Sequence, residues 1–139
     1  MTRHEILELV RENPVSHMAT VEGGSPRVRA METPIVDEKG LTFLTGTHKD
    51  VCRQLLADPS VELCYWSPEK GLQLRIRGMM ELLSDESVKR EIVETKFTFL
   101  KPVVERNGWK ALSVFRLSGG TVRVWSGSDP AGGSKTYEF

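Results

Sequence analysis

Cysteine is scarce in this chain of 139 residues: Cys52 and Cys64 are the only two, and they form no CxxC pair. Two thiols at this spacing match neither a disulfide framework nor a zinc site, and they indicate buried thiols in a reducing compartment. No stretch approaches the ~20 apolar residues of a membrane-spanning helix. The opening segment MTRHEILELV is charged and amphipathic, unlike the apolar run of a signal peptide. We therefore expect a cytoplasmic protein with no membrane partner.

Net charge and aromatic side chains are also lacking. The 19 basic residues balance the 19 acidic ones, and aromatic residues make up 7% of the chain. Nucleic-acid-binding domains usually carry a basic excess, and single-strand binders add stacking aromatic rings. We expect no nucleic-acid partner. A chain without net charge has no self-repulsion that would oppose association with a second copy.

Sequence motifs of the common nucleotide-binding and hydrolytic sites are absent. The chain contains no GxxxxGK[ST] loop, no GxGxxG turn, no HExxH and no GxSxG. Its three histidines, His4, His17 and His48, are scattered and have no zinc-type spacing. We expect no metal site and no catalytic side chain of the protein itself. Any demanding chemistry would then belong to a bound cofactor.

The order of periodic segments predicts one mainly antiparallel domain. A capped helix is expected over 2–13, where Thr2 and Glu5 have capping-box spacing, and a charged helix over 85–100 faces inward with Val88, Ile92 and Phe99. The remaining expected elements are strands 15–21, 26–31 and 41–45, a helix over 48–57, strands 61–66 and 72–83, and a last hairpin of strands 111–117 and 121–125. Residues 128–139, rich in glycine and serine, are expected to form a flexible tail. Meanders of strands with helices between them favour an α+β fold or a small barrel of about seven strands.

Arginine recurs on the expected strands. Because strand side chains alternate between faces, Arg27 and Arg29 share one face, opposite Val28 and Ala30. The same alternation applies to the arginines of strands 72–83 and 121–125. A barrel with a dry interior and an arginine-bearing outside is expected. For any single arginine, an ordinary solvated position is the simpler interpretation.

The stretch FLTGTHKDV, residues 43–51, places a lysine where a helix begins. Thr47 and Asp50 are spaced as an N-cap and its return partner, so Lys49 is expected in the first turn. A cation at this end of a helix is disfavoured by roughly 0.3–1 kcal/mol. Either Lys49 points into water, or an anion binds both its ammonium and the helix N–H groups. Together with the arginine-bearing sheet face, the second alternative predicts a phosphate pocket.

The run MATVEGGSPRVRAM, followed by GLTFLTGTHKDVCRQLLADPSVELCYW and LQLRIRGMMEL, resembles the pyridoxamine 5′-phosphate oxidase-like flavoproteins, the FMN-binding split-barrel family. The resemblance covers most of residues 5–127 and is closest to short bacterial members grouped with the 5-nitroimidazole reductases. It implies an α+β, mainly β fold: a six- to seven-stranded antiparallel split β-barrel with flanking helices, over residues 1–127. It also implies a homodimer with FMN at the interface, each cofactor touched by both chains.

The resemblance assigns cofactor-binding roles residue by residue. Arg29 and Lys49 match the family's phosphate-binding arginine and lysine, and Arg27 is a second candidate for the arginine. Gln73 matches a glutamine that contacts the isoalloxazine ring, and Trp66 ends the preceding strand. The complete expected set is Arg27, Val28, Arg29, Ala30, Thr45, Thr47, His48, Lys49, Trp66 and Gln73.

One departure from the family pattern bears on the substrate. Pyridoxamine phosphate oxidases have an arginine after a Trp-Gly-containing segment, and it helps hold the substrate phosphate. Here the chain reads Trp125-Ser126-Gly127-Ser128-Asp129, with no arginine after it. A flavin-dependent reductase of a small molecule, with a small-molecule electron donor and acceptor, is therefore expected rather than an enzyme of vitamin B6 oxidation. The alternatives are a split barrel that binds F420 or haem, and a non-catalytic flavin-binding module.

Overall fold

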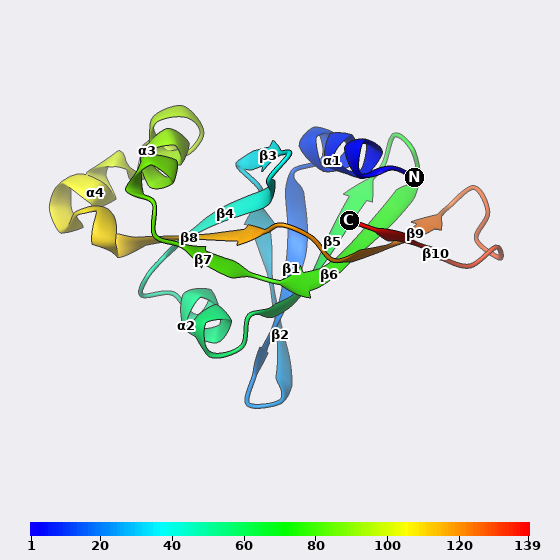
Figure 1. The fold of residues 1–139 in the computed structure, drawn as a ribbon, viewed down its shortest axis with the longest axis horizontal. Helices are drawn as coiled ribbons and strands as arrows, with labels where there is room; N and C mark the ends of the chain where they lie inside the picture. The colour runs from blue at the N-terminus through cyan, green and yellow to red at the C-terminus, as the bar shows by residue number, and fades with distance from the viewer.

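Two antiparallel sheets form the body of the protein in the computed structural model, which describes all residues 1–139 (Figure 1). The strands of the larger sheet are β1 (Val15–Glu22), β2 (Ser25–Glu32), β5 (Ser60–Ser67), β6 (Leu72–Met79), β9 (Thr121–Ser126) and β10 (Lys135–Glu138), in the spatial order β10-β9-β6-β5-β1-β2. Those of the smaller sheet are β3 (Ile35–Asp37), β4 (Gly40–Gly46), β7 (Glu81–Leu83) and β8 (Leu112–Leu117), in the order β3-β4-β8-β7. The expected mainly β split barrel is confirmed.

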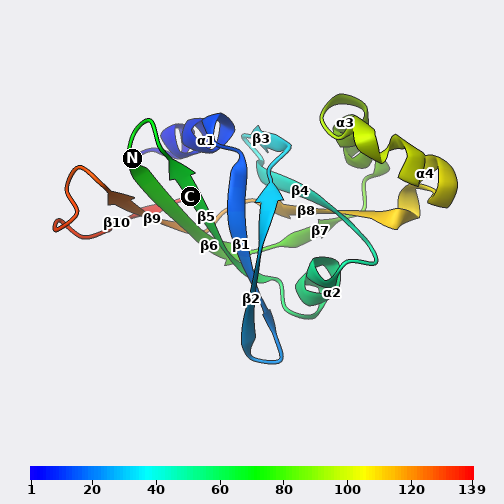
Figure 2. The same cartoon turned by 180° about the vertical axis from the view of Figure 1, so that it is seen from behind.

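Helices cover the edges and one end of this body. They are α1 (Arg3–Glu12), α2 (Asp50–Ala57), α3 (Glu86–Thr95) and α4 (Lys101–Asn107), with the short 3₁₀ turns η1 (Thr98–Leu100) and η2 (Trp109–Ala111) on either side of α4. In both views α3 and α4 lie at one end of the long axis, and the β9–β10 hairpin lies at the other (Figures 1 and 2). The β1–β2 hairpin projects from the body near α2.

The capped helix at the start of the chain is confirmed, within a residue at each end. The Glu5 backbone N–H donates to Thr2 Oγ1, and the Thr2 N–H donates to Glu5 Oε2, each at 3.2 Å. Its apolar side, which includes Ile6 and Val10, is buried in the main core. The cap fixes where the helix begins, so the apolar stripe meets the core in register.

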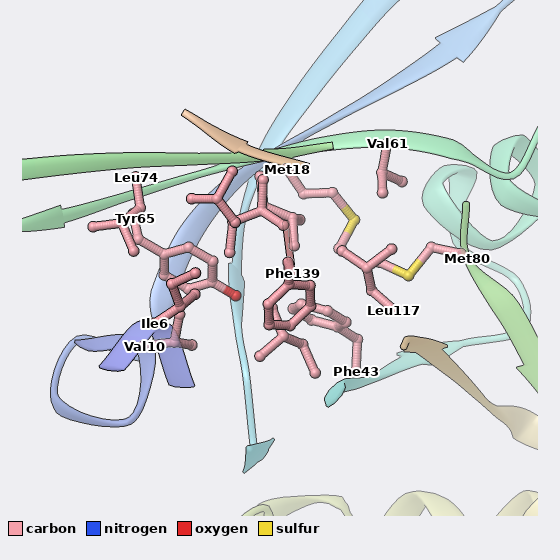
Figure 3. Close-up of a cluster of buried hydrophobic side chains, with 14 of the residues drawn as sticks. Ile6, Val10, Met18, Phe43, Val61, Tyr65, Leu74, Met80, Leu117 and Phe139 are labelled. Carbon is pink, nitrogen blue, oxygen red and sulfur yellow. The ribbon is translucent and has the colours of Figure 1, made fainter. Parts of the chain in front are cut away.

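The main core lies between the two sheets and α1. Met18, Leu74 and Tyr65 enter it from the larger sheet, and Phe43 enters it from the smaller one (Figure 3). The Tyr65 hydroxyl forms a 2.6 Å hydrogen bond with Thr33 Oγ1, so its polar atom is paired inside the core. Burial raises the pKa of Tyr65 to about 12.

The two sheets meet where the chain passes from one to the other, and here the expected strand connections are wrong. Residues 72–83 form two strands, because the chain leaves the larger sheet after Met79 and the Met80 N–H donates to Pro59 O at 2.8 Å. The expected hairpin of β8 and β9 is absent: β8 pairs with β4 and β7, whereas β9 pairs with β6 and β10. A Cβ at Gly78 would lie 2.5 Å from Gly119 O, so glycine allows the two segments to cross closely.

The expected helix over 85–100 is also interrupted. Helix α3 ends at Thr95, and the backbone N–H groups of Lys96 and Phe97 both donate to Ile92 O. A 3₁₀ turn and then α4 follow, so Phe99 leaves the helical face expected for it and is 70% exposed. Ile92 is buried and Val88 is half-buried.

The last residues of the chain are part of the fold, in contrast to the flexible tail expected over 128–139. Strand β10 pairs with β9, and Phe139 packs into the main core. The Phe139 N–H donates to Gly120 O at 2.8 Å. Together with the short strands β3 and β7, β10 raises the number of strands above the expected six to seven.

Strand alternation is correct for most of the larger sheet. Leu74, Ile76, Val122 and Val124 are buried, whereas the intervening arginines Arg77 and Arg123 are exposed. The edge strand β2 differs, because Val28 is 67% exposed rather than inside a dry barrel. The end of β2 near the hairpin is thus uncovered on both faces.

Candidate functional site

A cavity of about 420 Å³ lies between β2, β4, the start of α2 and the segment that links α3 to α4. This is within the ~300–1,000 Å³ range of small-molecule and cofactor sites. The cavity has a cationic end, formed by Arg29 of β2 and Lys49 at the start of α2, and His48 also lines it. Another wall is apolar and is lined by Phe97, Phe99, Leu100 and Val103. A ligand with an anionic group and a flat apolar body matches this division.

Lys49 is the N-cap residue of α2, which confirms a lysine at the helix start and corrects the expected cap. The Thr47 hydroxyl donates to Lys110 O at 2.8 Å instead of capping the helix. Asp50 forms an ion pair with Arg53 at 3.0 Å. Lys49 itself takes part in none of the ion pairs of the structure. Its ammonium and the first N–H groups of the helix are therefore available to an anion.

Gly46 at the end of β4 allows His48 and Lys49 to fold back over the strand. A Cβ at Gly46 would lie 2.8 Å and 3.0 Å from two ring atoms of His48 and 3.4 Å from Lys49 Cγ. The Lys49 N–H also donates to Gly46 O at 3.0 Å. The glycine thus lets the cationic end of the cavity form.

Arg29 approaches the cavity from β2 and is held by three acceptors. Its Nη1 donates to Met18 O at 3.1 Å and to Thr20 Oγ1 at 2.8 Å, and its Nη2 donates to Gln54 Oε1. Burial lowers the pKa of the Arg29 guanidinium, and the negative charge of Asp50 acts in the opposite direction. A guanidinium keeps its charge under such conditions. Arg29 is therefore a fixed cation at the cavity wall.

Half of the expected cofactor-binding residues lie around this cavity. Those that line it are Arg29, Ala30, Thr45, His48 and Lys49. Those that do not line it are Arg27, Val28, Thr47, Trp66 and Gln73. Arg27 and Val28 lie farther along β2, toward the hairpin, and Trp66 and Gln73 are cross-strand partners on the outer face of the larger sheet.

The apolar wall was not found from the sequence. Phe97 and Phe99, from the segment KFTFL, form a tilted ring pair with centroids 5.5 Å apart. The sequence predicts a regular helix over 85–100, which would separate the two rings around its axis. The sequence feature that could have indicated this wall is the cluster of large apolar residues around Phe97 and Phe99, which follows a highly charged helix.

The family model described as pyridoxamine 5′-phosphate oxidase matches residues 2–126 of this chain. The chain belongs to this family. The match spans both sheets up to β9 and includes every residue that forms the cavity.

Curated relatives carry the name pyridoxine/pyridoxamine 5′-phosphate oxidase. The protein of Microcystis aeruginosa is 29% identical over 85 residues, which cover 61% of this chain and 37% of the relative. That of Azotobacter vinelandii is 35% identical over 78 residues, which cover 55% of this chain and 36% of the relative. The matched part is thus little more than a third of each relative's length.

Solved structures share the fold. A NimC/NimA family protein from Clostridium acetobutylicum superimposes with a TM-score of 0.75 at 23% identity, covering 98% of this chain and 92% of that one. A pyridoxamine 5′-phosphate oxidase-related, FMN-binding protein from Nostoc punctiforme gives 0.67 at 18% identity, covering 98% and 89%. A haem-binding protein from Mycobacterium smegmatis gives 0.69 at 15% identity, covering 96% and 56%. One fold therefore carries different cofactors.

Two further observations concern other kinds of site. No helix is long and apolar enough to cross a membrane. No group of three or more histidine, cysteine or acidic side chains is placed to hold a metal ion.

Proposed function

We propose that this protein is an FMN-binding oxidoreductase, a flavin-dependent reductase of a small molecule that works as a homodimer. The observation that carries the proposal is the division of one cavity into a cationic end with Arg29 and Lys49 and an apolar wall with Phe97 and Phe99. FMN has the complementary division, with a phosphate at one end and an aromatic ring system at the other.

The cationic end fits the phosphate. A phosphate dianion at the start of α2 would meet the Lys49 ammonium and the free N–H groups of the helix, while Arg29 offers a guanidinium fork. No acidic side chain lines the cavity, and the carboxylate of Asp50, whose charge acts on Arg29, is paired with Arg53. The unfavourable position of a lysine at a helix start then has a compensating contact.

The apolar part of the cavity fits the ring system. Leu44, Thr45 and Leu112 form its floor on the smaller sheet, and the Phe97–Phe99 segment forms its wall. Flat rings pack well against such aromatic and aliphatic surfaces. Bound FMN would supply transfer of hydride or of single electrons, and the protein would supply position and electrostatics. The only ionisable side chains of the lining are Arg29, His48 and Lys49, so the proposal assigns no protein nucleophile.

A second copy completes the proposed site. The outer face of the larger sheet carries Trp66 and Gln73 and is covered by nothing in the single chain. Exposed apolar side chains on or beside this face include Val15, Val28 and Trp66. Exposed apolar side chains on an uncovered sheet face are typical of an interaction surface. In the proposed dimer each flavin contacts the cavity of one chain and the outer sheet face of the other.

A reducing, cytoplasmic setting is part of the proposal. Cys52 and Cys64 are both free, Cys52 buried as expected and Cys64 only half-buried. Free thiols without a disulfide partner are typical of proteins in a reducing compartment. The electron donor and acceptor are proposed to be small molecules.

The test is the visible absorbance spectrum of the purified protein, before and after incubation with FMN and removal of the excess. A retained flavin spectrum at about one FMN per chain is expected for one cavity per protomer. Reduction of that flavin by NADH or NADPH in the absence of oxygen then tests the reductase. A Soret band would redirect the cavity to haem, with His48 as the histidine in reach of it. A colourless protein that ignores FMN would overturn the flavin proposal.

A further inference from the structure

Gln54 of α2 is a buried amide in contact with the arginine of the proposed phosphate site. Its side chain is 3% exposed, and its Oε1 accepts hydrogen bonds from Arg29 Nη2 and Thr20 Oγ1. We infer that Gln54, oriented by Glu22, is a positioning residue that aims the Arg29 guanidinium at the phosphate group of the cofactor. The inference rests on the proposed function and deepens it.

The orientation of the Gln54 amide follows from its two neighbours. Glu22 carries a carboxylate, which accepts hydrogen bonds and cannot donate them. Gln54 Nε2 therefore faces Glu22 Oε2, at 2.6 Å. Arg29 only donates, so the amide oxygen must face the guanidinium. A reversed amide would place two acceptors together at one end and two donors at the other.

Thr20 closes the network from the inner face of β1. Its hydroxyl donates to Gln54 Oε1 at 2.6 Å and accepts from Arg29 Nη1 at 2.8 Å. Thr20 is buried, and no buried polar side-chain atom of the structure lacks a partner. Fully paired buried networks hold their members in one arrangement. Arg29 is thus held by the Thr20 and Gln54 side chains together with the backbone carbonyl of Met18.

The remaining donors of Arg29 show what this fixation leaves available. A guanidinium has five N–H groups. Three are used, by Met18 O, Thr20 Oγ1 and Gln54 Oε1. The two that remain are on Nε and Nη2, whose N–H groups can bind two oxygens of one phosphate side by side. With its other donors satisfied, Arg29 offers these two N–H groups to a ligand in the cavity.

An ion pair at the surface supports the network from outside. Arg53 donates to Glu22 Oε1 at 3.0 Å and to Asp50 at 3.0 Å. Hydrogen bonds from Gln54 and Arg53 lower the pKa of the Glu22 carboxyl, so the acceptor that orients the amide stays charged. Glu22, Gln54 and Arg29 thus form a continuous chain of hydrogen bonds from the last residue of β1 to the cavity.

The test compares FMN with riboflavin, which lacks the phosphate. Gln54→Met keeps the length of the side chain and removes both hydrogen-bonding ends, and Thr20→Val removes the hydroxyl with little change in shape. Leu56→Ala, at an exposed position of the same helix, is the matched control. Flavin affinity is measured by fluorescence titration for each chain, and thermal unfolding without flavin checks folding.

For Gln54→Met we expect FMN affinity to fall by about tenfold or more, which corresponds to loss of a hydrogen bond to a charged group. Riboflavin affinity should stay within about twofold, because the ring end of the cavity is unchanged. Thr20→Val should weaken FMN binding less, and Leu56→Ala should not change it. In an Arg29→Met background, Gln54→Met should have no further effect on FMN binding, because it acts through the arginine.

Three outcomes would overturn the inference. In the first, Gln54→Met leaves FMN affinity as in the wild type; in the second, it weakens FMN and riboflavin equally; in the third, it adds its full loss to that of Arg29→Met. The last two mean that Gln54 only holds α2 against the sheet. A wild-type protein that binds no FMN is a separate result, because it removes the proposed function and the inference together. If Gln54→Met fails to fold, Thr20→Val decides through the same FMN-to-riboflavin ratio.

Discussion

Trp66 of β5 and Gln73 of β6 are direct cross-strand partners, and neither lines the cavity that contains Arg29 and Lys49. Both lie on the outer face of the larger sheet, where Trp66 is 49% exposed. The residues proposed for the phosphate and two of those proposed for the ring are thus on different faces of one chain. In the proposed dimer they contact the same cofactor from two copies of the chain.

Mixing two defective chains tests this arrangement. Chains with Lys49→Ala and chains with Gln73→Ala are each expected to retain little FMN, one through the phosphate and the other through the ring. In a dimer of one chain of each kind, one of the two sites contains both substitutions and the other contains neither. After random exchange of subunits, about a quarter of all sites should bind FMN normally. The measurement is the flavin absorbance retained after gel filtration.

The control for the mixing experiment is a chain that carries both substitutions. Mixed with Lys49→Ala chains, it cannot form an intact site, so no flavin should be recovered. Recovery in that control, or none in the mixture of single variants, would contradict a site shared between two copies. A Gln73→Ala chain that holds FMN as the wild type does would remove Gln73 from the site.

Lys49→Ser is expected to move stability and cofactor binding in opposite directions. Serine is a favoured N-cap residue, whereas Lys49 makes no side-chain capping hydrogen bond. The free energy of unfolding without flavin should rise by about 0.5–2 kcal/mol. FMN affinity should fall by about tenfold or more, because a charged hydrogen-bond donor is lost. Chemical denaturation and flavin titration give the two quantities.

Lys70→Ser is the matched control for this substitution. Lys70 is exposed and pairs loosely with Glu12 at 3.7 Å, away from the cavity. It should change neither FMN affinity nor, by more than about 0.5 kcal/mol, stability. If Lys49→Ser destabilises the protein without flavin, then, contrary to our inference, a lysine at this helix start is not unfavourable.

Much of the fold and part of the site follow from local sequence rules. The capping pair Thr2 and Glu5, the alternating strands and the lysine at the start of α2 are all local features, and each is present. Arg29 and Lys49 were expected together, and the structure brings both to one cavity. Alternation on a strand and the polarity of a helix end depend on neighbouring residues, so the sequence suffices for them.

The features that the sequence did not reveal depend on contacts between distant segments. Nothing local stops the strand at Met79; the chain changes sheet because the Met80 N–H pairs with Pro59 O and Gly78 lets another segment cross. The break at Phe97 is the exception, because it is local: its N–H and that of Lys96 both turn back to Ile92 O, and no glycine or proline marks this helix end in the sequence. The apolar wall of the cavity arises from that break, so it could not be assigned before the fold was known.

Tyr65 makes stability depend on pH in the alkaline range. Its folded-state pKa is raised from 10.0 to about 12, so folding favours the protonated hydroxyl. This contribution is fully present below pH 10 and is lost as the pH rises from 10 toward about 12. The loss should reach roughly 2–3 kcal/mol in the free energy of unfolding. Urea denaturation across this range measures it, and Tyr65→Phe should remove this part of the pH dependence while lowering stability at neutral pH by about 1 kcal/mol, since Thr33 loses its partner.

Substitutions in the Phe97–Phe99 ring pair of the cavity wall distinguish a role in packing from contact with the ligand. Phe97 is 8% exposed and Phe99 is 70% exposed, although both line the cavity. Phe97→Ala should lower the free energy of unfolding by about 3–5 kcal/mol, because a buried ring leaves a void. Phe99→Ala should change it by less than about 0.5 kcal/mol.

For flavin binding, in contrast to stability, we expect Phe99→Ala to have a clear effect. Because the Phe99 ring is 70% exposed, its removal should change the packing little, so a fall in affinity for both FMN and riboflavin would report direct contact with the ring system. This pattern differs from that of Lys49→Ser, which should weaken FMN alone. If Phe99→Ala leaves both affinities unchanged, the flavin ring system lies over Leu44 and Leu112 of the smaller sheet and not against the Phe97–Phe99 wall.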